Sequence, residues 1–188
     1  MGECYLTPKG MAEVLLEKAG IDSLMEQRLD NIGYFRQPAS KGHHLAEYGG
    51  LMRHSINVTQ RLVTLTLTLG VSWPRKESPY LVGMLHDLVK CHCYKFKEEV
   101  DSKPQWEYTQ PVYPGHGACS VAIASEIGIK LVKEEIVAIT YHMGMYGVGR
   151  EYTDKEFDNA LRLHGPQVLA TIYADWWAAR VDEKEGAE

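Results

Sequence analysis

The feature that most constrains this chain is a histidine–aspartate pair inside an apolar run. The segment YLVGMLHDLV has apolar residues on both sides of His86 and Asp87, and Lys90 follows one helical turn after His86. Burying such polar groups costs free energy unless they find partners. Two interpretations remain open. The pair is an ordinary core histidine and carboxylate with satisfied hydrogen bonds, or both side chains reach one metal ion from neighbouring positions about 100° apart on a helix.

Further candidate metal ligands stand in or beside other apolar segments. His54 lies in GGLMRHSINV, His116 in YPGHGACSV, His142 in ITYHMGMY and Asp175 in IYADWWAAR. Histidine and aspartate side chains are ligands for first-row divalent metals. Helical bundles build metal sites by sending about one ligand inward from each of several helices. The pattern therefore indicates, without requiring, one shared metal centre.

The sequence predicts a mostly helical chain with one β-hairpin. Thr7 is expected to cap the first helix, with Pro8 at its first position and Gly20 after its end. Val63 to Leu69 alternates with threonine as a strand would, but no turn separates it from the preceding helix, so a helix is preferred. The polar end, 182–188, is predicted to be a frayed tail. The expected helices are 7–20, 22–33, 51–70, 78–94, 115–128, 132–144, 153–165 and 165–184, with a hairpin insert at about 94–113.

Length and composition favour one globular domain. The 188 residues suffice for a single domain, 1–188, with its own core. The net charge of −5 argues against a protein that holds long duplex nucleic acid. No apolar run is long enough to cross a bilayer, and the N-terminus lacks a signal-peptide pattern. We therefore expect a cytoplasmic protein with thiols rather than disulfides and no membrane partner; the oligomeric state is not predicted.

The run Cys91-His92-Cys93 admits a second kind of site. A redox pair normally has two residues between its cysteines, and this run has one. A structural zinc site would require a second pair of ligands, and Cys119 stands alone downstream. Small core thiols are the preferred interpretation, and structural zinc is the alternative.

The ordered set of histidines and aspartates resembles the HD superfamily of metal-dependent phosphohydrolases. HDLVK is similar to the central motif of that family, including its lysine. The upstream run PASKGHHLAEYGGLMRHSINV is similar to the HD domains of certain bacterial 3′-to-5′ exoribonucleases. The chain also resembles small stand-alone HD proteins of bacteria and phages. The resemblance, which covers about 38–180, implies an all-α HD-domain helical bundle, here with a small β-hairpin insert.

The resemblance also implies roles for particular residues. His54, His86, Asp87 and Asp175 would hold a first divalent ion, and His116 and His142 would hold a second with Asp87 as the bridge. Lys90 would stabilise Asp87 or the phosphoryl charge. The loop histidines His43 and His44 are candidates to contact substrate or to protonate a leaving group.

Three other predictions concern residues around this set. Arg53, next to His54, and Arg150, in the glycine-rich segment GMYGVGR, are candidates to bind a phosphate, although both are more often surface charges. Trp176 and Trp177 flank Asp175 and are expected to pack in the core.

The resulting hypothesis is a phosphohydrolase that uses a metal-activated water on a phosphate ester of a nucleotide or of a short single-stranded oligonucleotide. One or two ions are expected, and Mn, Fe, Co, Ni, Zn and Mg are not distinguished. The alternatives are a catalytically silent module that binds metal or nucleotide, and a helical interaction protein whose histidines are incidental.

Overall fold

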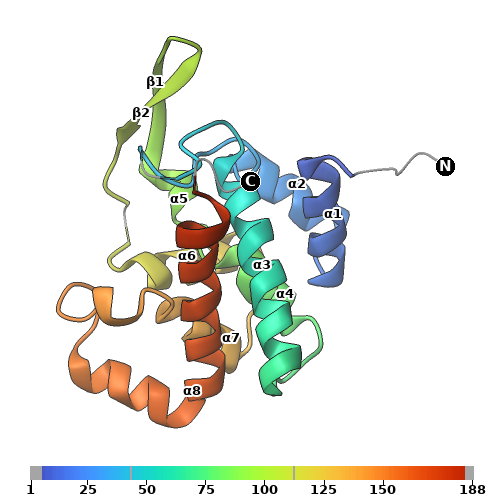
Figure 1. Cartoon of the computed structure of the whole chain (residues 1–188), viewed down its shortest axis with the longest axis vertical. Coiled ribbons are helices and arrows are strands. Elements are labelled where there is room, and N and C mark those ends of the chain that lie inside the picture. Colours follow the sequence, from blue (N-terminus) through green and yellow to red (C-terminus); the bar gives the residue numbers. More distant parts are fainter. Residues whose placement is uncertain (1–5, 43, 112, 185–188) are drawn as a thin grey trace.

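The computed structural model describes residues 6–42, 44–111 and 113–184. It shows a mostly helical molecule with one two-stranded antiparallel hairpin, which confirms the predicted all-α class with a hairpin insert (Figure 1). The elements are α1 (Pro8–Lys18), α2 (Ser23–Asn31), α3 (Gly50–Leu69), α4 (Ser78–Leu85), α5 (Lys90–Cys93), β1 (Tyr94–Val100), β2 (Lys103–Tyr108), α6 (His116–Glu126), α7 (Lys133–Thr140), the 3₁₀ turn η1 (Gly144–Tyr146), α8 (Asp154–Trp177) and the π-helical turn η2 (Ala178–Asp182).

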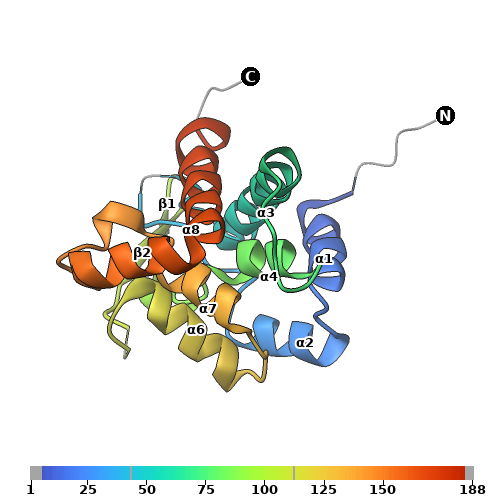
Figure 2. The ribbon, with the colours of Figure 1, turned by 90° about the horizontal axis from the view of Figure 1, so that it is seen from below.

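The core forms where α3, α4 and α8 meet. Helices α3 and α8 lie side by side in both views, and α4 packs against α1, α3 and α7 (Figures 1 and 2). Leu62 of α3 and Leu85 of α4 are fully buried in this core, and α8 contributes the small residues Ala170 and Ala174. Small side chains allow α8 to approach its neighbours closely, so residues of α3, α4 and α8 can reach one another. None of the helices in the described ranges combines the length and the apolarity needed to cross a bilayer.

Helix α3 is continuous to Leu69, so the helical interpretation of the threonine-alternating segment is confirmed. The threonines fit a helix because their hydroxyls bond locally. Thr64 Oγ1 donates to the carbonyl oxygen of Gln60, and Thr68 Oγ1 donates to that of Thr64, both at 2.8 Å. The Thr66 hydroxyl accepts the indole N–H of Trp73 at 3.0 Å.

The predicted helix over 78–94 is divided, which corrects the sequence analysis. Helix α4 ends at Leu85, a tight turn follows, and α5 begins at Lys90. The amides of Leu88 and Lys90 donate to carbonyls three residues earlier, at 3.2 and 3.0 Å, as in 3₁₀ geometry. The pair at 86 and 87 therefore lies in the turn after a helix rather than in its middle.

Helix α4 begins at Ser78, where the predicted helix also begins. Ser78 is the first helical residue and does not cap the helix; Glu77 holds the cap position. The Ser78 hydroxyl instead donates to the buried carboxylate of Glu135 at 2.7 Å. Arg75 grips the same carboxylate with two bonds of 2.7 Å. These bonds fix the start of α4 to the first turn of α7.

The two helices predicted over 153–165 and 165–184 join as α8 with a break at His164, whose φ of −139° and ψ of 28° are not helical. The break directly precedes Gly165 and Pro166. A proline inside a helix removes a backbone donor, and its ring clashes with the carbonyl four residues earlier, which breaks the helix on its N-terminal side. After α8 the chain continues into the π-helical turn η2, which includes Asp182, and Glu183 is buried, so these two residues are not frayed as predicted; residues 185–188 of the predicted tail lie outside the described residues.

Two glycines allow helices to touch through their backbones. A Cβ atom on Gly83 of α4 would lie 2.5 Å from Thr59 Oγ1 and 2.6 Å from Thr59 Cα of α3. A Cβ on Gly117 of α6 would lie 2.3 Å from the carbonyl oxygen of Ile139 in α7. Because such distances are below van der Waals contact, only glycine fits. These contacts bring the end of α4 close to α3 and the start of α6 close to α7.

The hairpin projects from the helical body (Figure 1). Its strands are joined by Asp101 and Ser102, whose φ angles of 49° and 59° are both left-handed, as a two-residue hairpin turn requires. Trp106 of β2 is buried, and its indole N–H donates to the carbonyl oxygen of Ala46 at 3.3 Å. The hairpin is thereby fixed to the loop that precedes α3. The strands end at Tyr108, inside the predicted range of about 94–113.

Candidate metal centre

The structure brings the six predicted metal ligands together from separate elements. His54 lies in the second turn of α3, His116 is the first residue of α6 and Asp175 lies in the last turn of α8. The remaining three lie in turns, His86 and Asp87 after α4 and His142 after α7. Their ligand atoms fall within 4.8 Å of one another in three overlapping groups: His54–His86–Asp87, His86–His142–Asp175 and Asp87–His116–His142.

Asp87 occupies the middle of this cluster. Its Oδ1 lies 2.6 Å from His116 Nε2 and 3.4 Å from His142 Nε2. Its Oδ2 lies 3.4 Å from His86 Nε2 and 3.5 Å from His54 Nε2. Each carboxylate oxygen thus faces a different pair of imidazoles, which is the arrangement that a bridging carboxylate requires.

Two of the imidazoles are oriented by backbone carbonyls. His86 Nδ1 lies 2.9 Å from the carbonyl oxygen of Gly83, and His142 Nδ1 lies 2.6 Å from that of Ile139. A carbonyl oxygen only accepts hydrogen bonds, so both Nδ1 atoms carry the proton. In the neutral rings the Nε2 lone pairs of His86 and His142 therefore point into the cluster.

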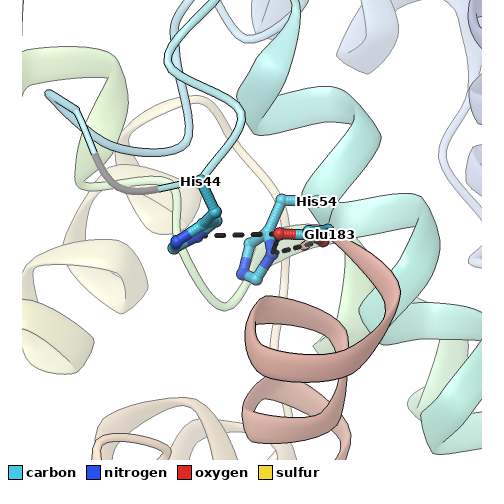
Figure 3. A group of neighbouring side chains, drawn as sticks. All are labelled: His44, His54 and Glu183. Atoms are coloured by element: carbon cyan, nitrogen blue, oxygen red, sulfur yellow. Dashed lines mark hydrogen bonds and ion pairs between the residues drawn. The ribbon is translucent and has the colours of Figure 1, made fainter. Parts of the chain in front are cut away.

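His54 is oriented by Glu183, a carboxylate that lies in the segment predicted to be frayed (Figure 3). His54 Nδ1 lies 2.9 and 3.1 Å from the two carboxylate oxygens of Glu183, and Asn57 Nδ2 donates to the same group at 2.9 Å. Glu183 was not among the predicted site residues. The available signal was its position eight residues after Asp175, close to two helical turns along the same segment.

The inward-facing atoms of the cluster are hydrogen-bond acceptors when the imidazoles are neutral. His54 Nε2 and His86 Nε2 face each other at 3.3 Å, and His54 Nε2 lies 3.1 Å from Asp175 Oδ1. The buried Nε2 of His142 has no hydrogen-bond partner among the residues that the structure describes. Converging lone pairs and carboxylates require a cation, either a proton or a metal ion, so the donor set fits a divalent metal.

Charge reinforces this requirement. Burial opposes ionisation of both inner carboxylates, but Lys90 and nearby histidines hold the pKa of Asp87 well below its usual range, and His54 lowers the pKa of Asp175. The ammonium group of Lys90 lies 2.6 Å from Asp87 Oδ2 and brings one positive charge to the cluster. With Glu183 also ionised, three carboxylates face one ammonium, and two negative charges remain uncompensated.

Without a metal, protons supply part of the missing positive charge. Burial disfavours a charged His54, but its hydrogen bonds to Asp175 and Glu183 raise its pKa to about 9. The pKa of His142 is also raised, against burial, by Asp87. Metal ions and protons therefore compete for the same nitrogen atoms.

Solvent reaches the cluster along one set of side chains. The exposed fractions are 24% for His116, 21% for His44, 18% for Asp175 and 12% for Lys90, whereas the other ligand side chains are at most 4% exposed. A surface pocket of about 630 Å³ lies elsewhere, among residues of α1, α3 and the segment before α4. The cluster is thus a nearly closed site that solvent reaches at the rim formed by His44, Lys90, His116 and Asp175.

The remaining predicted site residues lie at different distances from the cluster. His44 stands beside it, with its ring centroid 5.1 Å from that of His54, and His43 falls outside the described residues. Burial and the nearby His54 and Lys90 lower the pKa of His44 to about 4, so its ring is neutral at pH 7.

The two arginines are not drawn into the cluster. Arg53 is exposed and pairs with Glu47. Arg150 is also exposed. Its neighbour Glu151 accepts the backbone N–H of His116 at 2.8 Å, which anchors the glycine-rich segment to the start of α6. Glu151 is the second carboxylate near the site that sequence reasoning missed.

The prediction that both tryptophans pack in the core is wrong. Trp176 and Trp177 are 45% and 49% exposed, because helix α8 turns Asp175 inward and its two successors toward the surface. Each indole lies against an arginine: Arg180 is 4.9 Å from the ring centroid of Trp176, and Arg61 is 5.6 Å from that of Trp177. These contacts pair exposed aromatic faces with cations.

The cysteines behave as small core residues. Cys91, Cys93 and Cys119 are buried free thiols, and burial raises the pKa of Cys93 to about 11. His92 is exposed. Within the described ranges, the clusters of possible metal ligands include no cysteine, which favours core thiols over structural zinc.

In comparisons with known proteins, no family model, curated protein or solved structure matches the chain. The support for a function therefore comes from the geometry of the cluster.

Proposed function

We propose that this chain is a metal-dependent phosphohydrolase of the HD superfamily type. The observation that carries the proposal is the cluster of inward-facing lone pairs around Asp87, drawn from α3, α6, α8 and the turns after α4 and α7. An incidental set of histidines would direct its polar atoms to ordinary hydrogen-bond partners. Here the Nδ1–H groups of His54, His86 and His142 each donate to a protein acceptor, and their Nε2 atoms converge on carboxylates.

The grouping of ligands supports two ions bridged by Asp87. His54, His86 and Asp175 lie on the side of Oδ2 and would hold one ion, while His116 and His142 lie on the side of Oδ1 and would hold the other. Bound divalent ions supply an activated water and offset the charge on phosphoryl oxygens. Mixed nitrogen and oxygen ligands suit Mn, Fe, Co, Ni or Zn, and Mg is also retained as a candidate.

The residues around the ligands have separate proposed roles. Lys90 holds Asp87 in place through the 2.6 Å ion pair and keeps positive charge beside the position of the substrate phosphate. His44, neutral and on the solvent-facing rim, is placed to hydrogen-bond the substrate or its leaving group. Arg53 and Arg150 remain predictions for phosphate binding.

The substrate class follows from size and charge. The cluster is nearly closed, and the chain carries a net charge of −5, so a small anion attracted by bound cations fits better than a long polyanion. We therefore propose a nucleotide-like phosphate ester or a short single-stranded oligonucleotide as substrate.

The test measures metal content and hydrolysis together. Purified chain is loaded with Mn, Fe, Co, Ni, Zn or Mg and assayed on nucleotides, generic phosphodiesters and short oligonucleotides. Asp87→Ala and His86→Ala are expected to lose turnover by at least about a thousandfold, in line with loss of metal-assisted catalysis. His92→Ala is the matched control, because His92 is exposed and outside the cluster.

Three outcomes decide between the hypotheses. Metal uptake with turnover that the two cluster variants lose supports the proposal. Metal uptake without turnover on any substrate favours the catalytically silent binding module. A wild-type chain that takes up no divalent metal favours a helical protein with incidental histidines.

A further inference from the structure

Glu183 lies against the metal centre without belonging to the proposed ligand set. It comes from the C-terminal end of the chain, and its side chain is only 1% exposed (Figure 3). It accepts the Nδ1–H of His54 on the ring edge opposite the cluster, and it accepts the side-chain N–H of Asn57 at 2.9 Å. His44 Nε2 approaches the same carboxylate to 3.7 Å. Glu183 therefore contacts two of the histidines considered for the site.

A carboxylate in this position determines what His54 can do. It fixes the proton on Nδ1, which leaves Nε2 as the only lone pair of the neutral ring. It also fixes the ring orientation, in which Nε2 lies 3.1 Å from Asp175 Oδ1 and 3.5 Å from Asp87 Oδ2. A negative partner makes the imidazole a stronger donor toward a metal.

The chain holds Glu183 in place by a clamp outside the cluster. The guanidinium of Arg61, on α3, makes two bonds to Asp182 at 2.8 and 2.5 Å and lies over the ring of Trp177. The amide of Glu183 donates to the carbonyl oxygen of Ala178, five residues earlier, at 3.1 Å. This wider π-helical turn sets the angular position of Glu183 relative to α8, and π-helical turns recur at functional sites.

We infer that Glu183 is a positioning residue for the metal centre and that the Arg61 clamp links docking of the C-terminal turn to metal affinity. The inference rests on the part of the proposed function that assigns a divalent ion to the cluster. By linkage, if docking of the turn favours the ion, the ion favours docking of the turn by the same free energy.

The test compares metal binding in four variants, by calorimetric titration with Mn²⁺ or Zn²⁺. Glu183→Ala removes the acceptor, and Glu183→Gln keeps an oxygen that accepts the Nδ1–H but removes the charge. Arg61→Ala releases the clamp without touching a ligand. Arg36→Ala is its matched control, because Arg36 makes two comparable bonds to Asp30 at the surface, at 2.7 Å each.

Glu183→Ala is expected to weaken metal binding about 10- to 100-fold, as for other acceptors of a ligand histidine. Glu183→Gln should lie between Glu183→Ala and the wild type, and Arg61→Ala should weaken binding by about tenfold through the same histidine. Arg36→Ala should bind as the wild type. In Zn²⁺-loaded protein with ¹⁵N-labelled histidine, the Nδ1–H of His54 should be protected from exchange with solvent by its bond to Glu183, and Glu183→Ala should lose that protection.

A purely structural role would lower the melting temperature of the metal-free variants and leave metal affinity and the protection of the His54 Nδ1–H unchanged, which would overturn the inference. If Glu183→Ala does not fold, Glu183→Gln and Arg61→Ala give the same decision. This test measures metal binding and not hydrolysis. A chain that binds metal here and shows no turnover in the hydrolysis assay would therefore contradict only the proposed function.

Discussion

The protons on three ring nitrogens define the chemistry of this cluster at the scale of single residues. His54, His86 and His142 each spend an Nδ1–H on an acceptor outside the cluster, and each presents Nε2 to Asp87. The neutral imidazoles and the carboxylates are therefore all acceptors, and the cluster lacks the positive charge needed to balance them. Lys90 supplies one such charge, and a metal or bound protons must supply the rest.

Lys90→Met tests this charge balance. The substitution keeps most of the side-chain volume but leaves buried Asp87 without its ammonium, so the free energy of unfolding of the metal-free protein should fall by about 3 kcal/mol. Metal-loaded protein should lose less, because the ion compensates Asp87 directly. Urea unfolding with saturating metal and with chelator measures both values.

The control for this substitution is Lys97→Met on the exposed hairpin, where Lys97 pairs with Glu98 at 3.6 Å. Its effect should stay within about 0.5 kcal/mol in both states. Equal losses for Lys90→Met with and without metal would contradict the charge-balance explanation.

The pH dependence of stability should differ between the metal-free and metal-loaded states. The pKa of His54 is raised from 6.5 to about 9 in the fold, so its contribution is complete below about pH 6.5 and is lost as the pH rises toward 9. The pKa of Asp87 and that of Asp175 are lowered, so their contributions are present above about pH 4 and are lost in more acidic solution.

Metal-free protein should therefore melt highest near pH 6.5. Below that pH the lowered pKa of His44, about 4, and the lowered pKa of His86 remove stability, and toward pH 9 the protein should lose at most about 3 kcal/mol through His54. The rise in melting temperature on adding metal should grow over pH 6 to 9, because fewer protons compete for His54. Thermal melts across this range, with and without metal, check the prediction. A metal-induced rise that shrinks with increasing pH would refute it.

Single residues also show how far the sequence could predict the site. The proposed ligands were recognisable because each is a polar residue in or beside an apolar segment, as Asp175 is within IYADWWAAR. Glu183 gave no such contrast, since DEKE is a run of charged residues and such a run is usually solvated. Its role depends on the π-helical turn, which no local residue pattern predicted.

At the scale of elements, close approaches between helices determine where the ligands meet. Gly83 of α4 has two structural roles. Its lack of a side chain allows contact with Thr59 of α3, and its carbonyl oxygen accepts the Nδ1–H of His86. The helix contact and the orientation of a proposed ligand thus depend on the same backbone atoms.

Gly83→Ala should separate α4 from α3. The added Cβ would meet the backbone Cα of Thr59 at 2.6 Å, which no rotamer change relieves, so the free energy of unfolding should fall by about 3 kcal/mol or more. Metal affinity should fall with it, because His86 moves with the end of α4. Gly165→Ala is the control, since a Cβ there meets no heavy atom within 4 Å. Calorimetry measures the stability of both variants. A Gly83→Ala variant as stable as the wild type would contradict the close contact between α4 and α3.

The elements were predicted well where caps and breakers are local. Thr7 accepts the N–H of Gly10 as the cap of α1, and Gly20 and Gly33 follow their helices with positive φ. The turn after α4 was missed because LHDLVK contains no glycine or proline; contacts of Asp87 with Lys90 and His116 compensate for the lost helical bonds. The two halves of α8 were predicted as separate helices that meet at Gly165, and the structure joins them as one element with a break at His164.

At the scale of the whole molecule, a bound ion would act as a cross-link between distant parts of the chain. The proposed ligands span residues 54 to 175 and come from α3, α6, α8 and two turns. A ligand that binds only the folded state stabilises it by about 2.7 kcal/mol at a free concentration of 100 times its dissociation constant. A cross-link of this kind should protect all the connected segments at once.

Hydrogen exchange measures this protection. With saturating metal, amides in 86–90, at the start of α6 and in 178–184 should exchange up to about a hundredfold more slowly than with chelator, the factor that corresponds to about 2.7 kcal/mol. Amides of the hairpin between Tyr94 and Tyr108 should change little where they exchange by local opening, because the hairpin carries none of the proposed ligands. Protection confined to one part of the site would show an ion held locally, for example by His44, His54 and Glu183, and would contradict a centre shared among the helices.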